Sequence, residues 1–105
     1  MSTERKTNYT SNSQQRLLKV IKTLSGNEFM GLTPGEIASA LKVQPAAITR
    51  DLQNLKEAGF AEEVPELGRW RLGPALVQLG LAYLDCRELN KARLNELHSR
   101  YTRTP

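Results

Sequence analysis

The chain has 105 residues, enough for one small domain, and its hydrophobic content of 39% supplies a modest core. A single cysteine and a single histidine exclude an intrachain disulfide and argue against a structural metal site. The net charge is +4, no apolar run reaches the length of a membrane span, and the N-terminus lacks the apolar core of a signal peptide. We therefore expect a cytoplasmic protein.

Residues 1–12 are rich in Ser, Thr and Asn, with Tyr9 as the one large apolar side chain apart from Met1. This composition predicts a flexible arm. The arm holds Arg5 and Lys6 against Glu4, and residues 1–26 as a whole carry five basic and one acidic side chain, a balance of +4. It is either a solvated tail or a segment that contacts a negatively charged partner, and the sequence leaves both readings open.

The next pattern predicts a helix from about Gln14 to Ser25, capped by Ser11 or Ser13. Its apolar face has helical spacing and consists of Leu17, Val20, Ile21 and Leu24. The connector that follows is more apolar than a free loop. We expect Phe29 to cover the core and Leu32 to lie in a very short strand.

Residues 33–59 predict two helices joined by a tight turn. Thr33 and Glu36 have the spacing of a capping box, and Pro34 and Pro45 each suit the first position of a helix. The second helix buries one face, formed by Ile48, Leu52 and Leu55, and Gly59 is a natural stop. Two short helices with this turn form a helix-turn-helix unit, which usually presents the start of its second helix to the major groove of DNA.

After Gly59 the pattern becomes extended. Residues 60–64 and 69–72 predict two short strands joined by a turn at 65–68. Alternation places Trp70 towards the core, and Arg69 and Arg71 on the opposite face. A hairpin behind a helix-turn-helix is a wing, so residues 13–73 predict a winged-helix domain that is mainly α with a small β-hairpin.

Residues 74–105 predict a long C-terminal helix that begins at Pro74. Gly80 or the charged segment 85–88 could bend or break it. The helix would be about 40 Å long, too long for a domain of this size to cover. We expect its first apolar residues, Leu76, Leu79 and Tyr83, to complete the core or its junction with this helix. The later ones we assign to a homodimer contact: Leu89, Leu94, Leu97 and Tyr101.

Three parts of this fold supply candidate DNA contacts. Arg50 is the best candidate, because it is polar and offset from the buried face of its helix. A structural ion pair is the alternative role for it. Gln can read adenine, and an alanine or threonine methyl can touch thymine. The full set is Thr33, Gln44, Pro45, Ala46, Ala47, Thr49, Arg50, Gln53, Arg69 and Arg71.

Three segments resemble the DNA-binding domain of the IclR family of bacterial transcription regulators. Residues 32–38 read LTPGEIA, residues 48–60 read ITRDLQNLKEAGF, and residues 70–80 read WRLGPALVQLG. The resemblance covers about residues 14–82 and implies the family's fold, its dimeric habit and a DNA contact at Arg50. The start of the second helix departs from the family's usual Lys, Ser and Thr. The family's large effector-sensing domain has no counterpart here, so we expect no small-molecule effector.

The sequence thus predicts a dimeric regulator that binds a specific double-stranded DNA site of pseudo-palindromic sequence. The alternative is a protein-interaction module that binds another regulator or a polymerase. This alternative draws on the acidity of residues 27–73, which carry five basic and seven acidic side chains, a balance of −2. No nucleophile–base pair, phosphate loop or metal cluster is visible, so we expect neither an enzyme nor a cofactor.

Overall fold

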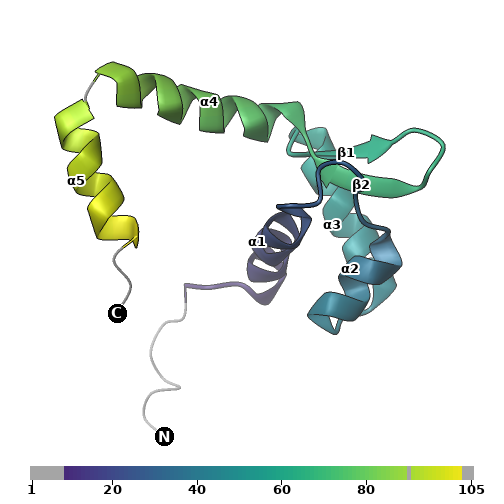
Figure 1. Ribbon diagram of the computed structural model, residues 1–105. Coiled ribbons are helices and arrows are strands. Elements are labelled where there is room, and N and C mark those ends of the chain that lie inside the picture. The colour runs from purple at the N-terminus through teal and green to yellow at the C-terminus, as the bar shows by residue number, and fades with distance from the viewer. Residues whose placement is uncertain (1–8, 90, 103–105) are drawn as a thin grey trace, which may run out of the picture.

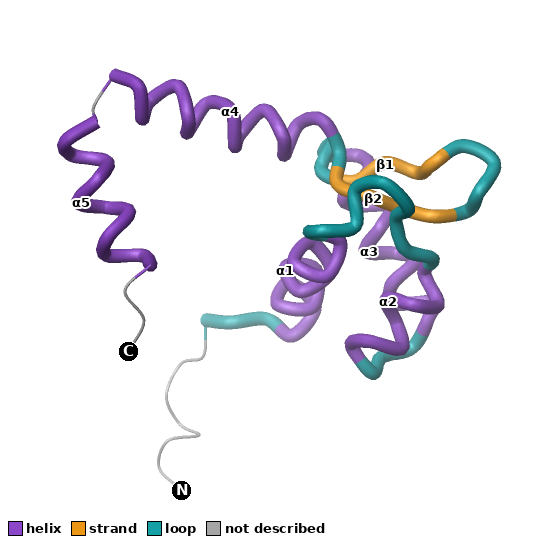
Figure 2. The backbone as a smooth tube through the Cα atoms, in the orientation of Figure 1, coloured by secondary structure: helices purple, strands orange, loops and turns teal. Residues whose placement is uncertain are grey.

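The computed structural model describes residues 9–89 and 91–102. Along the chain lie α1 (Asn12–Leu24), α2 (Pro34–Leu41), α3 (Pro45–Glu57), β1 (Ala61–Val64), β2 (Arg69–Leu72), α4 (Pro74–Leu89) and α5 (Lys91–Thr102). In Figures 1 and 2, α1, α2 and α3 gather beside the hairpin, α4 projects away from them, and α5 turns back from its end. The fold is a winged helix-turn-helix, as predicted.

Helix α1 begins at Asn12, two residues before the predicted start at Gln14. The Ser11 hydroxyl caps it by accepting a hydrogen bond from the Gln14 N–H at 3.3 Å. Residues 11 and 12 therefore belong to the helix and its cap rather than to the arm. Most of the predicted arm, residues 1–8, lies outside the described residues.

The two helices of the helix-turn-helix begin where the sequence predicts. At α2 the capping box is complete: the Glu36 N–H donates to the Thr33 hydroxyl at 3.1 Å, and the Thr33 N–H donates to the Glu36 carboxylate at 2.9 Å. Pro34 and Pro45 occupy the first turns of α2 and α3. Between them Lys42 takes the left-handed conformation, with φ of 59°, which makes the turn tight.

Strands β1 and β2 form an antiparallel hairpin in which Ala61 faces Leu72 and Val64 faces Arg69. Leu32 pairs with Trp70 as an isolated bridge, which confirms the predicted short strand. Trp70 is buried, as alternation predicts. Phe29 differs from expectation: its side chain is 95% exposed and does not cover the core.

The core lies between the three helices and the hairpin. The side chains of α3 occupy its centre, because Ile48, Leu52 and Leu55 all face inward, as predicted. The remaining buried hydrophobic residues are Ala47 of α3 and, from the other elements of the domain, Val20, Leu24, Ile37, Ala38, Ala61 and Trp70.

One carboxylate, Asp51, lies on the buried face of α3, with 7% of its side chain exposed. Arg16 of α1 satisfies it with two hydrogen bonds: Nε donates to Oδ2 at 2.6 Å and Nη2 donates to Oδ1 at 2.8 Å. The pair raises the pKa of Arg16, chiefly through these hydrogen bonds. It fixes α1 against α3 with a geometry that apolar contacts alone do not impose.

The C-terminal region consists of two helices rather than the single predicted one, and α5 begins at Lys91 beyond the charged segment 85–88. Where α4 leaves the domain, a side chain at Gly73 would collide with the backbones of Gly59 and Ala61. The Gly73 N–H donates to the Phe60 carbonyl at 2.8 Å. The start of α4 is therefore held tightly against the domain.

Two of the three residues expected to complete the core or its junction with α4 are largely exposed. Leu79 is 57% exposed and Tyr83 is 48% exposed, whereas Leu76 is partly buried. Helix α4 consequently extends into solvent within one turn of its start.

Replacing Asp51 with Asn should lower the free energy of unfolding by about 1–3 kcal/mol, because a buried hydrogen-bonded charge pair is broken. Urea denaturation followed by circular dichroism measures the change. Glu57→Gln is the matched control, since it removes the same charge from an exposed position on the same helix. Equal stability of the two variants would show that the Arg16–Asp51 pair does not stabilise the domain.

Candidate nucleic-acid interface

The outer face of α3 carries most of the predicted contact residues. The exposed ones are Gln44, Pro45, Ala46, Thr49, Arg50 and Gln53. Ala47 differs, because it is only 8% exposed and faces the core beside Ile48. Ala47 is therefore not part of the exposed face of α3.

Arg50 is set apart from the other arginines of residues 13–73. Arg16, Arg69 and Arg71 each form an ion pair within the domain. Within the described residues, the Arg50 guanidinium forms no hydrogen bond or ion pair, and its side chain is exposed. The sequence left a structural ion pair open as the alternative role of Arg50. In the structure it is the neighbouring residue, Asp51, that forms such a pair, with Arg16. Arg50 is therefore available to an external anion or base.

Arg50 also borders the start of α1. A shallow depression of about 270 Å³ lies between α1 and α3. Its lining includes Arg50 and Asn54 from α3 and Ser13 and Gln14 from α1. The sequence did not single out these three neighbours, because their proximity depends on how α1 packs against α3.

The remaining predicted contacts are engaged inside the domain. The Thr33 hydroxyl accepts the Glu36 N–H, so it serves the helix cap. Arg71 Nε donates to Glu62 at 2.7 Å across the hairpin. Arg69 bonds both to Glu36, at 3.1 Å, and to backbone carbonyls of the α1–α2 loop.

The carboxylate of Glu36 is stabilised where α2 begins. A hydrogen bond from the Thr33 N–H lowers its pKa, and the positive charge of Arg69 lowers it further. A negative charge is favoured at the N-terminus of a helix. The carboxylate of Glu36 thus occupies the N-terminus of α2, where an external phosphate could otherwise bind.

The predicted dimerisation residues of α5 are only partly described. The side chains of Leu89 and Leu94 lie outside the described part of the structure. Leu97 is half-buried, and Tyr101 is 76% exposed.

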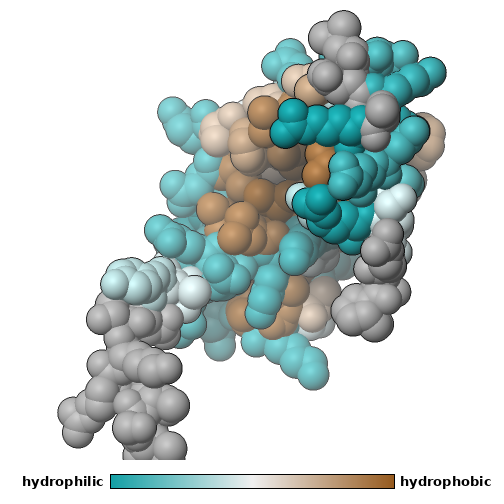
Figure 3. Space-filling view, turned by 90° about the vertical axis from the view of Figure 1, so that its left-hand side faces the viewer, coloured by the Kyte–Doolittle hydropathy of each residue, from teal (hydrophilic) through white to brown (hydrophobic). Residues whose placement is uncertain are grey.

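A larger apolar surface lies on α4, whose exposed hydrophobic side chains are about half accessible. Figure 3, which views the molecule from the side towards which α4 and α5 project, shows hydrophobic residues gathered in the centre of that face. A group of large apolar side chains exposed together often marks an interaction surface. The residues concerned are Val77, Leu79, Leu81, Tyr83 and Leu84.

The described ranges, 9–89 and 91–102, hold no cluster of three or more His, Cys, Asp or Glu side chains arranged for a metal ion. None of their helices is both long and apolar enough to cross a membrane. Cys86 is an exposed free thiol on α4.

Most of this chain is similar to known proteins. No model of a known protein family matches the chain. A glycerol operon regulatory protein of Streptomyces griseus is 36% identical over 83 residues, which cover 78% of this chain and 32% of that protein. The chain thus spans about a third of the length of the curated relatives it matches.

Two solved structures extend the comparison. An IclR transcriptional regulator from Alicyclobacillus acidocaldarius superimposes with a TM-score of 0.69 and 32% identity, over 87% of this chain and 36% of that one. The Zalpha domain of Cyprinid Herpesvirus3 ORF112, solved with Z-DNA, gives a TM-score of 0.53 and 26% identity, over 59% of this chain and 98% of that one.

Sequence and structure agree in these comparisons. The helix-turn-helix, the wing and the start of α4 all fall within the span shared with the regulators. This chain carries an IclR-type winged helix-turn-helix domain.

Proposed function

We propose that this chain is a transcriptional regulator that binds a specific site in double-stranded DNA as a homodimer. Helix α3 enters the major groove with Gln44, Ala46, Thr49, Arg50 and Gln53 towards the bases. The observation that carries the proposal is the free Arg50 guanidinium on an exposed polar helix face, in a domain whose other arginines are paired. The relatives named above, which are regulators, support it.

The remaining candidates have lesser parts in this proposal. Pro45 and Thr33 lie at the starts of α3 and α2, where they approach the backbone of the duplex. Arg71 is bonded only to a surface carboxylate, which leaves it able to turn to a phosphate. We place the protein in the cytoplasm of a bacterial cell, where the chromosome is accessible.

A second candidate function is docking to another protein. Phe29 is 95% exposed and Met30 is 65% exposed on one loop, which favours a protein partner. Selection from a library of random DNA duplexes decides between the two functions. Enrichment of a single sequence supports the regulator, whereas failure to enrich any duplex leaves the protein-docking function.

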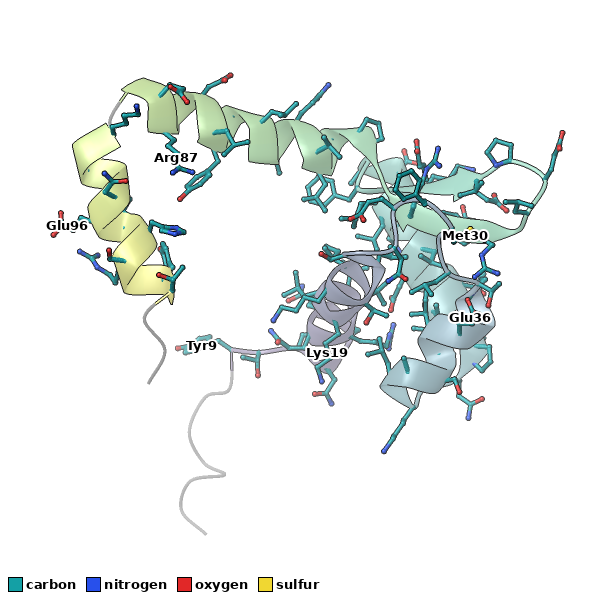
Figure 4. The ribbon with its side chains drawn as sticks, viewed as in Figure 1. Tyr9, Lys19, Met30, Glu36, Arg87 and Glu96 are labelled. Carbon is teal, nitrogen blue, oxygen red and sulfur yellow. The ribbon has the colours of Figure 1, made fainter. Side chains whose placement is uncertain are left out.

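Arg50→Ala should weaken binding to the selected duplex by about 1–3 kcal/mol, because a bidentate contact to a base edge is lost. Arg50→Lys should retain non-specific binding but lose discrimination at one base pair. Fluorescence anisotropy measures both effects. The control is Arg87→Ala on α4, which removes the same charge far from α3 (Figure 4). Equal effects of Arg50→Ala and Arg87→Ala would remove Arg50 from the site.

Deleting residues 1–8 should flatten the slope of log affinity against log salt concentration by up to about 2 units, because Arg5 and Lys6 are lost. The deletion stops before Ser11 so that the cap of α1 remains intact. The double variant Arg5→Gln plus Lys6→Gln should reproduce the result. An unchanged slope would identify the segment as a free tail.

The homodimer is supported by the exposed apolar surface of α4, to which we add Leu89, Leu94, Leu97 and Tyr101. Burying each leucine contributes roughly 1.5–3 kcal/mol, and several from two chains can offset the cost of association. A two-fold dimer would select a pseudo-palindromic duplex.

Leu81→Asp plus Leu84→Asp should convert a dimer into folded monomers that bind DNA much more weakly, since two linked readers gain effective concentration. Sedimentation equilibrium measures the mass. Leu97→Asp plus Tyr101→Asp tests the share contributed by α5. A wild-type protein that is monomeric at tens of micromolar would contradict the homodimer.

A further inference from the structure

The wing meets the rest of the domain at a backbone bridge. The Leu32 N–H donates to the Trp70 carbonyl at 2.8 Å, and the Trp70 N–H donates to the Leu32 carbonyl at 2.7 Å. Gly31 lies directly over the same strand, where a side chain would collide with the Trp70 carbonyl. The α1–α2 loop is thus pressed against β2, immediately before the first turn of α2.

The Arg69 side chain closes this junction. Its Nε donates to the Met30 carbonyl at 2.9 Å, and its Nη2 donates to the Gly31 carbonyl at 3.2 Å. Nη2 also donates to Glu36 Oε1 at 3.1 Å. In Figure 4, Met30 and Glu36 lie on the same side of the domain, close to β2. One guanidinium therefore holds two elements, the α1–α2 loop and α2.

Glu36 continues the chain of contacts into the helix-turn-helix. The same oxygen, Oε1, accepts the Thr33 N–H at 2.9 Å. The Thr33 hydroxyl in turn accepts the Glu36 N–H. The network runs from β2 through Arg69 and Glu36 to the cap of α2, so it ties the wing to the first helix of the helix-turn-helix.

We propose that Arg69 is a positioning residue, which sets the wing relative to the helix-turn-helix and does not itself contact DNA. Only 26% of its side chain is exposed, and turning it outwards would leave two carbonyls and one carboxylate without this donor. Arg71 differs, because its one partner lies on the same hairpin. This inference rests on the proposed DNA binding and revises the role predicted for Arg69.

A fixed wing raises affinity by lowering the cost of ordering it when the duplex binds. Loosening the junction therefore weakens binding without removing a phosphate contact. If Arg69 instead contacted a phosphate directly, loosening its contact with Glu36 would have the opposite effect on affinity. Freeing the guanidinium from Glu36 would then strengthen binding and steepen its salt dependence.

The deciding variant is Glu36→Gln, assayed on the duplex selected by the wild-type protein. A glutamine at this position still completes a capping box, so the helix is preserved, but its neutral oxygen no longer forms a charge-assisted bond with Arg69. We expect affinity to fall by about threefold to tenfold with an unchanged salt slope. Glu62→Gln is the matched control, because it removes the same charge from the partner of the other wing arginine. It should not weaken binding. Unchanged or tighter binding by Glu36→Gln would overturn the inference.

Arg69→Lys supplies a second test. A lysine keeps the charge but cannot bridge three acceptors with a planar fork. We expect it to bind as weakly as Glu36→Gln, and the double variant to be no weaker than either single one. Wild-type affinity for Arg69→Lys, or a salt slope lower by about one unit in Arg69→Gln, would assign Arg69 to a phosphate instead.

Trp70, the single tryptophan of the chain, reports on the junction without DNA. Glu36→Gln and Arg69→Lys should shift its fluorescence emission to longer wavelength, while thermal melting confirms a folded domain. Emission identical to wild type would contradict the network. A wild-type protein that binds no duplex defeats the proposed function and the inference together, whereas wild-type binding with an unaffected Glu36→Gln defeats the inference alone.

Discussion

The rotation of α3 about its own axis decides which side chains this domain can present, and the Arg16–Asp51 pair constrains that rotation. Ile48, Leu52 and Leu55 give α3 a buried stripe, but apolar packing tolerates modest rotation. A buried carboxylate bonded through both oxygens tolerates much less, because rotation would leave its charge without a partner. Once Asp51 points inward to α1, the preceding residue, Arg50, must point to the side and outward.

Most arginines of the winged domain are paired with acidic side chains of the same domain. Its arginines mostly neutralise its own carboxylates, which ties α1, the α1–α2 loop and the hairpin to α2 and α3. Little positive charge near α3 is therefore available to a polyanion. The net positive charge of the chain lies in residues 1–26 and 74–105. Such a surface favours recognition by shape and specific contacts over long-range attraction, and it limits binding to arbitrary DNA.

Local signals in the sequence predicted most of the fold. The capping box at Thr33, the prolines at 34 and 45 and the alternation around Trp70 act within a few residues, so each can be read directly. The partners of Arg16 and Arg69 lie 35 and 33 residues away and depend on how the elements pack. Asp51 lies on the same face of α3 as Ile48. Its position in the sequence therefore indicated that a cationic side chain would pair with it inside the domain.

The junction at Gly73 has a mechanical consequence. Backbone contact with Gly59 and Ala61 leaves the start of α4 little freedom, so the direction of this helix is inherited from the domain. Helix α4 has 16 residues and therefore acts as a lever about 24 Å long. A tilt of about 10° at Gly73 would displace its far end by about 4 Å, close to one base-pair step of DNA. A small change of backbone angle at Gly73 would thus become a larger displacement of the far end of α4.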